Sequence, residues 1–134
     1  SLYETPIPLD EDATIYSAVY RSGKPLGKVT RKSFAVNKAT GCDYTCNPEA
    51  GWEHLNKGFG LTDGRRGYAR DMRRWISFYQ DTVQIVVELK KPQKVKEVAF
   101  SSLWRPVNEI WPARAMGVSV SMDGQTFIRW ALNG

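Results

Sequence analysis

The stretch TVQIVVELKKPQKVKEVAF, residues 82–100, carries the alternation of apolar and polar side chains that is typical of β-strands. In its first run, Val83, Ile85 and Val87 share one face. The residues KKPQ, 90–93, form a short polar turn before the second run. We therefore expect residues 82–89 and 94–100 to pair as antiparallel strands.

Two further hairpins are predicted on either side of this stretch. Residues 14–20 and 28–36 are rich in β-branched and aromatic side chains, and RSGKPLG at 21–27 supplies the turn. Residues 116–122, MGVSVSM, precede the turn DGQ and the run TFIRWAL. Residues 42–67 are interpreted as loop because of their glycines and Asn47-Pro48. Short strands with Gly/Pro-rich turns, and no long amphipathic helix, predict an all-β sandwich.

The composition is that of a soluble globular chain. Of its 134 residues, 42% are hydrophobic and 25% charged, so we expect one domain, or one domain plus a fragment. No apolar run approaches the roughly 18 residues that span a bilayer. The chain begins at Ser1 without a methionine and is interpreted as a mature or excised piece.

The net charge of +5 is concentrated in part in RRGYARDMRRW, residues 65–75. Such an arginine cluster is suited to nucleic acid, anionic lipid or anionic glycan. The plainer interpretation, which we favour, is a solvated loop whose arginines pair with nearby acids.

The two cysteines, Cys42 and Cys46, are expected to be free thiols. In a strand, residues four apart lie about 13 Å from one another, whereas a disulfide needs Cα atoms within about 7 Å. With a single histidine, His54, they make a poor metal-binding set.

Motifs of catalysis are missing from the sequence. It has no G-x-S-x-G nucleophile elbow and no phosphate-binding loop. Nothing in the spacing of the acidic residues requires the carboxylate pair of a glycosidase. We therefore expect a chain that is not itself an enzyme.

The loop SSLWRPVNEIWP, residues 101–112, has the residue types of a sugar-binding site. A sugar needs an aromatic platform for its C–H face and fixed polar groups for its hydroxyls. Such loops also fill protein interfaces. The predicted contacts are Trp104, Arg105, Asn108 and Glu109, with Trp52 and His54 from the loop at 42–55. Trp75, Trp111, Phe100 and Phe127 are predicted to be core residues.

Four motifs in order resemble a discoidin-type domain, also called the coagulation factor type C (F5/8 type C) fold, whose bacterial branch is the family 32 carbohydrate-binding modules. They are GLTDGRRG (60–67), RDMRRWISF (70–78), VQIVVELKKPQKVKEVAF (83–100) and GVSVSMDGQTF (117–127). The resemblance implies a galactose-binding-domain-like jelly-roll β-sandwich over residues 37–134. It also implies a structural calcium ion near the TDG turn, with Asp63 as its side-chain ligand.

Residues 1–36 resemble the closing hairpin of a small fibronectin-like domain, or a linker, that precedes such modules in bacterial family 20 β-hexosaminidases. The resemblance implies a non-catalytic module that tethers a secreted, periplasmic or cell-surface glycoside hydrolase to glycans. Its expected partners are a glycan and the catalytic domain of that enzyme, with no nucleic acid and no membrane span. The alternatives are a structural or protein-interaction domain without a sugar site, and adhesion to anionic lipid.

The sequence departs from the family pattern at its end. The family continues past the DG turn with at least one more strand, whereas this sequence ends at RWALNG. We expect that residues 14–36 pack against the sandwich, that two chains associate through a strand edge, or that the fold stays open at one edge.

Overall fold

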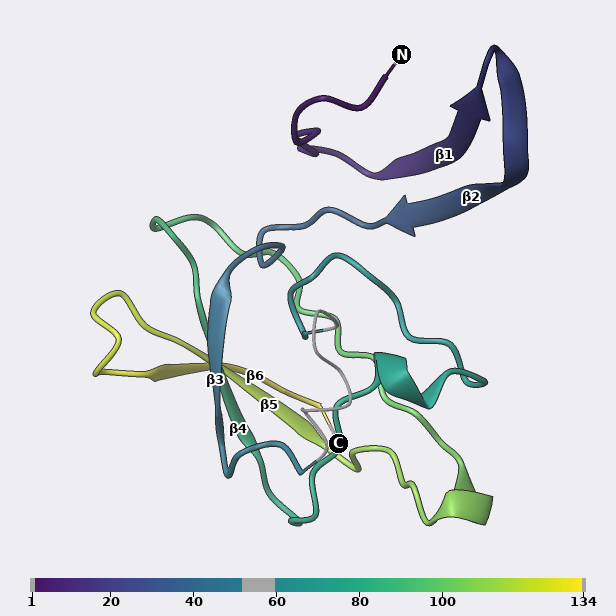
Figure 1. Ribbon diagram of the computed structural model, residues 1–134. Helices are drawn as coiled ribbons and strands as arrows, with labels where there is room; N and C mark the ends of the chain where they lie inside the picture. Colours follow the sequence, from purple (N-terminus) through teal and green to yellow (C-terminus); the bar gives the residue numbers. More distant parts are fainter. Residues whose placement is uncertain (1, 52–59, 134) are drawn as a thin grey trace.

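The computed structural model describes residues 2–51 and 60–133, and it is an all-β structure (Figure 1). Within these residues the helical pieces are two short 3-10 turns, η2 (Met72–Arg74) and η3 (Pro106–Asn108). The predicted all-β class is therefore confirmed. The strands are β1 (Ala13–Arg21), β2 (Lys24–Phe34), β3 (Asp43–Asn47), β4 (Gln84–Glu88), β5 (Met116–Val120) and β6 (Ile128–Asn133).

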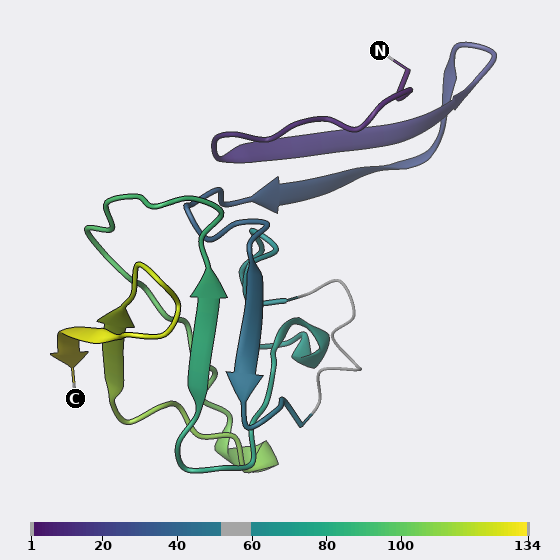
Figure 2. The ribbon, with the colours of Figure 1, turned by 90° about the vertical axis from the view of Figure 1, so that its left-hand side faces the viewer.

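The strands pair in three antiparallel sheets of two strands each, β1–β2, β3–β4 and β5–β6. Figure 2 shows the β1–β2 hairpin projecting from one end of the molecule, while β3–β4 and β5–β6 lie beside one another in the body. Each sheet keeps free edges because, over the described ranges, no strand pairs with more than one other.

The β1–β2 hairpin is confirmed, with a tighter turn than the sequence predicted. Arg21 and Lys24 are paired, so Ser22 and Gly23 alone form the turn. Both turn residues have positive φ, 48° and 75°. Two successive positive φ values match the right-handed twist of the flanking strands. β2 therefore begins at Lys24, inside residues 21–27, which were expected to form the turn.

The predicted pairing of residues 82–89 with 94–100 is wrong. β4 pairs instead with β3, with Val87 opposite Tyr44 and Ile85 opposite Cys46. Residues 94–100 form no strand, and Val98 and Phe100 remain exposed. The apolar side chains of β4 are half-buried in the body, so burial favours the distant partner over the neighbouring run.

The interpretation of residues 42–67 as loop is also wrong in part, because β3 lies within it. Its five residues, DYTCN, alternate between exposed and half-buried, which is the pattern of a strand with one covered face. The strand extends the backbone directly from Cys42 through Cys46. Both cysteines are free, as predicted.

The β5–β6 hairpin is confirmed. Val118 lies opposite Ala131 and Ser119 opposite Arg129, so Trp130 is an extra residue that bulges from β6. The DGQ turn joins the two strands, with Gly124 at φ 71°.

The fully buried part of the described structure is small. Cys42, Leu103 and Thr62 are 6%, 8% and 9% exposed. The Thr62 hydroxyl donates to the Cys42 carbonyl at 2.7 Å, and Gly41 N–H donates to the Thr62 carbonyl at 2.7 Å. These bonds join the start of β3 to the turn at residues 60–65.

Much apolar surface stays open to solvent. The chain exposes 11849 Å², whereas a compact monomer of this mass exposes roughly 7000 Å². The predicted core positions Trp111, Phe100 and Phe127 are wrong, since all three side chains are exposed. A two-stranded sheet has too little area to cover such side chains from both sides.

Trp75 is the predicted core residue that does pack, although it is only half-buried. A Cβ atom on Gly67 would come within 2.5 Å of its ring, so the ring lies directly against that glycine. Its Nε1 donates to the Tyr68 carbonyl at 3.0 Å.

Over residues 2–51 and 60–133, the contacts between the hairpin and the body lie at the base of the hairpin. Ala35 N–H donates to the Gly64 carbonyl at 2.7 Å, and the Arg65 guanidinium lies 5.7 Å from the centre of the Phe34 ring. Beyond this junction the residues of β2 are exposed. The predicted packing of residues 14–36 against the body is therefore not observed.

Candidate functional site

The candidate site is a closed turn between Arg105 and Ile110. Arg105 N–H donates to the Ile110 carbonyl at 2.9 Å, and Ile110 N–H donates to the Arg105 carbonyl at 3.2 Å. Pro106 begins η3 inside this pair, where its fixed φ suits the turn and its missing N–H removes no bond. The backbone alone thus holds the loop in one shape.

Two tryptophans flank this hydrogen-bonded pair, one on each arm of the turn. Trp104 and Trp111 are each 68% exposed, and Val107 at the tip is 84% exposed. Leu103 takes the buried position next to Trp104. Both large rings are consequently available to a ligand.

Glu109 closes the turn in a left-handed conformation, with φ 57° and ψ 30°. This conformation costs a residue with a Cβ about 1–2 kcal/mol, and glycine avoids the cost. Asn108 and Glu109 are both exposed. Glu109 therefore places an exposed carboxylate at the end of η3, in a conformation that glycine would adopt without this cost.

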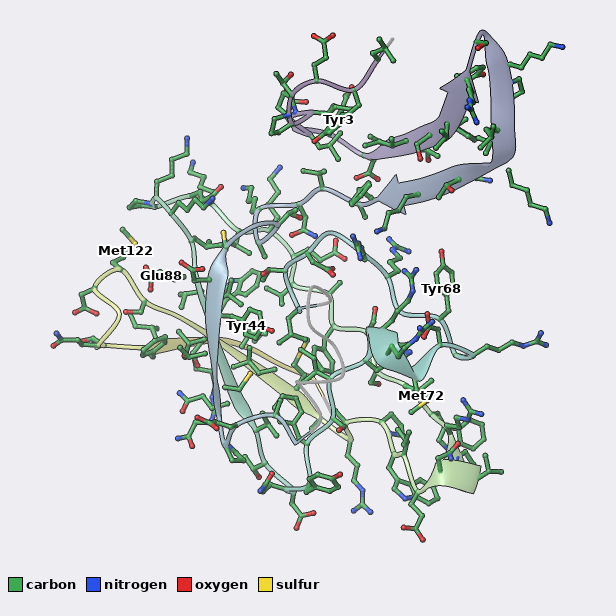
Figure 3. The ribbon with its side chains drawn as sticks, in the orientation of Figure 1. Tyr3, Tyr44, Tyr68, Met72, Glu88 and Met122 are labelled. Carbon is green, nitrogen blue, oxygen red and sulfur yellow. The ribbon has the colours of Figure 1, made fainter. Side chains whose placement is uncertain are left out.

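Arg105 fixes the turn to the arginine-rich segment at residues 65–75. Its Nη1 donates to the Ala69 carbonyl at 3.2 Å. Figure 3 shows Tyr68 and Met72, which belong to this segment, on the side of the molecule that carries η3. The Arg105 side chain therefore positions the turn, and only its remaining N–H groups can reach a ligand.

The arginine-rich segment is partly paired within itself, as the plainer interpretation predicted. Asp71 accepts from Arg73 Nε at 3.0 Å and from Arg74 Nε at 3.2 Å. The hydrogen bond from Arg73 is the main reason that the pKa of Asp71 lies below its ordinary value. The Arg74 guanidinium also lies 5.0 Å from the centre of the Tyr68 ring. Arg66 and Arg70 remain exposed.

Four of the six predicted sugar contacts, Trp104, Arg105, Asn108 and Glu109, come together in or beside this turn. The other two, Trp52 and His54, lie outside the described residues. The sequence interpretation missed Trp111 as a surface ring. Its place opposite Trp104 across the Arg105–Ile110 pair is known only from the structure, so the sequence offered no signal for it.

Asp63 is the predicted calcium ligand, and its environment fits that role. Its Oδ1 accepts from Arg65 N–H at 2.9 Å, whereas its Oδ2 is buried and has no hydrogen-bond partner in the described structure. A buried carboxylate oxygen without a donor suits a hard cation. No cluster of three His, Cys, Asp or Glu side chains forms in the described ranges, so backbone carbonyls would have to supply the other ligands.

Among the described residues, no helix is both long enough and apolar enough to cross a bilayer.

No protein-family model, no curated protein and no solved structure matches this chain. The assignment of a function therefore depends on the residues and their geometry.

Proposed function

We propose that the chain is a non-catalytic carbohydrate-binding module of the discoidin type, with the jelly-roll sandwich of that family. It would tether a glycoside hydrolase, such as a secreted or periplasmic β-hexosaminidase, to glycans. Residues 1–36 would then belong to a preceding fibronectin-like domain or linker. The all-β fold and the order of the four sequence motifs support this proposal.

One observation carries the proposal. Trp104 and Trp111 are both 68% exposed, and they stand on the two arms of a turn that holds Asn108 and Glu109. A ring can stack on the C–H face of a sugar while the amide and carboxylate bond its hydroxyls. Because the turn is already closed by backbone hydrogen bonds, little entropy is lost on binding.

A shallow site of this kind should bind weakly, on the order of 0.1–1 mM, which corresponds to about −4 to −5.5 kcal/mol. A weak site suffices for a tether, since a polymeric substrate offers many sites to the attached enzyme.

The test is a glycan array followed by titration calorimetry on the best ligand. We expect Trp104→Ala to abolish measurable binding and leave the melting temperature almost unchanged, because the ring is exposed and its removal opens no cavity. Trp130→Ala is a matched control, since this exposed tryptophan on β6 lies outside the turn.

Normal binding by folded Trp104→Ala would place the site elsewhere. Failure of the unsubstituted chain to bind any glycan would favour the alternative, a structural or protein-interaction domain of the same enzyme. The large exposed apolar surface would then be the part of the chain that a protein partner covers.

A second candidate function is adhesion to anionic lipid, and one observation favours it. Val107 is 84% exposed at the tip, between two exposed tryptophans, and Arg105 joins the turn to the arginine-rich segment. Apolar tips insert at the interface while basic residues meet anionic head groups. Sedimentation with phosphatidylserine vesicles tests it. A Val107→Asp variant that loses vesicle binding but keeps glycan binding would separate the two functions.

A further inference from the structure

The excess positive charge of this chain is concentrated around the candidate turn. The arginine-rich segment, residues 65–75, holds five arginines and one aspartate, and residues 101–115 hold two arginines and one glutamate. The rest of the sequence has twelve basic and twelve acidic residues. These two stretches therefore account for the whole net charge of +5.

The arginine-rich segment places Arg70 next to the point where the candidate turn is attached. Asp71 N–H donates to the Tyr68 carbonyl at 3.0 Å, which closes a tight turn with Ala69 and Arg70 at its tip. The Ala69 carbonyl accepts from Arg105 Nη1 at 3.2 Å. Arg70 thus directly follows the residue that Arg105 bonds.

Two arginines of this segment keep their charge available to a ligand. Asp71 is already bonded to Arg73 and Arg74. Arg66 and Arg70 are exposed, and neither forms an ion pair with any residue that the structure describes. The fork of N–H groups on a guanidinium matches the two oxygens of a carboxylate. Arg66 and Arg70 can therefore each bind a carboxylate that a ligand brings.

The candidate turn itself offers no excess charge. Within residues 103–111 the charge of Arg105 is offset by that of Glu109. Glu109 is exposed, and its carboxylate only accepts hydrogen bonds. It can accept from the hydroxyls of a neutral sugar, and it would repel an anionic group placed over the same turn. The ligand that fits both parts has a neutral unit over the turn and an anionic unit toward Arg70.

Building on the sugar-binding function proposed above, we infer that the glycan bound by this chain is acidic, with a neutral, hydroxyl-bearing unit beside a unit that carries a carboxylate. The neutral unit stacks on Trp104 and bonds Asn108 and Glu109. The carboxylate of the next unit lies against Arg70 or Arg66. Charge complementarity favours this ligand over a neutral glycan. The Glu109 carboxylate favours it over single-stranded nucleic acid, which also stacks on rings but carries a phosphate at every residue.

The experiment is titration calorimetry of the whole chain with oligosaccharides of chondroitin and of hyaluronan, in which a neutral unit alternates with a uronic acid. Their carboxyl-reduced forms have the same backbones without the charge. We expect the acidic forms to bind about tenfold more tightly in low salt, as two exposed ion pairs allow. The difference should shrink as sodium chloride is added.

The variant Arg66→Gln/Arg70→Gln should lose most of this preference for the acidic forms. The matched control is Arg21→Gln/Lys24→Gln, which removes the same charge at the turn of the β1–β2 hairpin and should keep the preference. Equal affinity for acidic and reduced forms, or no binding of the acidic forms, overturns the inference. A preference that Arg66→Gln/Arg70→Gln retains overturns it as well.

The same titrations separate this inference from the proposed function. If the preference for acidic forms is absent but Trp104→Ala abolishes the binding of a neutral glycan, only the inference fails. If folded Trp104→Ala binds the acidic forms as well as the unsubstituted chain does, the sugar site at the turn fails, and the inference fails with it. Tighter binding of oligothymidylate than of any glycan would assign the surface to single-stranded nucleic acid.

Discussion

The chain contains the dipeptide Asp-Gly twice, at Asp63-Gly64 and at Asp123-Gly124, and the structure uses the two copies differently. Both glycines have left-handed backbones, with φ 72° and 71°. Gly64 lies against the backbone of the hairpin junction, where a Cβ atom would be 3.2 Å from the Ala35 carbonyl oxygen. At Gly124 a Cβ atom would meet nothing within 4 Å.

The aspartates differ still more. Asp123 Oδ1 accepts from Thr126 N–H at 2.8 Å, from Gln125 N–H at 2.9 Å and from the Ser121 hydroxyl at 2.8 Å. These bonds, with that from Thr126 first, hold the pKa of Asp123 well below its ordinary range. Asp63 instead has a buried oxygen with no donor. The same dipeptide is thus a turn whose carboxylate is bonded by its neighbours in one place, and a turn with a buried carboxylate oxygen that has no donor in the other.

The largest expected effect compares the two glycines. Gly64→Ala combines the left-handed backbone with a close approach to Ala35, so it should lower the free energy of unfolding by about 2–4 kcal/mol. Gly124→Ala has the cost of the left-handed backbone but no close contact, so it should lower the free energy of unfolding by about 1–2 kcal/mol. Urea denaturation of both variants measures the difference. Equal losses would mean that the contact at the hairpin junction contributes nothing to stability.

Calcium tests the two aspartates. If Asp63 holds the ion with a dissociation constant near 1 mM, then 10 mM calcium stabilises the fold by about 1.4 kcal/mol. We expect the melting temperature to rise between chelator and 10 mM calcium in the unsubstituted chain and in Asp123→Asn, but not in Asp63→Asn. The absence of any rise in the unsubstituted chain would contradict the site. Magnesium, which prefers a tighter octahedral site, is the control ion.

The smallest expected effect is the change in melting temperature on lowering the pH, which measures the contribution of the Asp123 carboxylate. The carboxyl has a folded-state pKa below its ordinary value of 3.8, so its stabilisation is complete above that pH. It is lost as the pH falls below 3.8 toward the folded-state pKa. Between pH 6 and pH 2.5 the melting temperature of Asp123→Asn should therefore fall less than that of the unsubstituted chain. Parallel curves would show that the turn bonds do not depend on the charge. Asp71 is present in both proteins, so the difference isolates Asp123.

The candidate turn shows how far a sequence prediction of the site can go. The types and spacing in LWRPVNEIW identified four residues that the fold does bring together, because they are neighbours in the chain and one tight turn includes them. The sequence could not say that Trp111 is exposed or that Arg105 bonds to Ala69, since both depend on how distant segments meet.

Local chemistry by itself determined the two hairpins. Ser22 and Gly23 both have positive φ, and Asp123 accepts from residues of its own turn, so the short-range pattern was enough to predict β1–β2 and β5–β6. The all-β class follows from the same alternation and turn signals. The free state of both cysteines was also predictable, from the reach of an extended backbone.

Only the tertiary structure decided which strand β4 pairs with and which aspartate is left with an orphan oxygen. Residues 94–100 alternate between apolar and polar side chains as a strand should. Such alternation predicts which side chains share a face, but it does not predict which other strand will pair with it. The choice of β3 depended on where Ile85 and Val87 could be covered. Likewise, Asp63 and Asp123 both accept from neighbours in their own turns, and only the structure shows that Asp63 Oδ2 is buried without a donor.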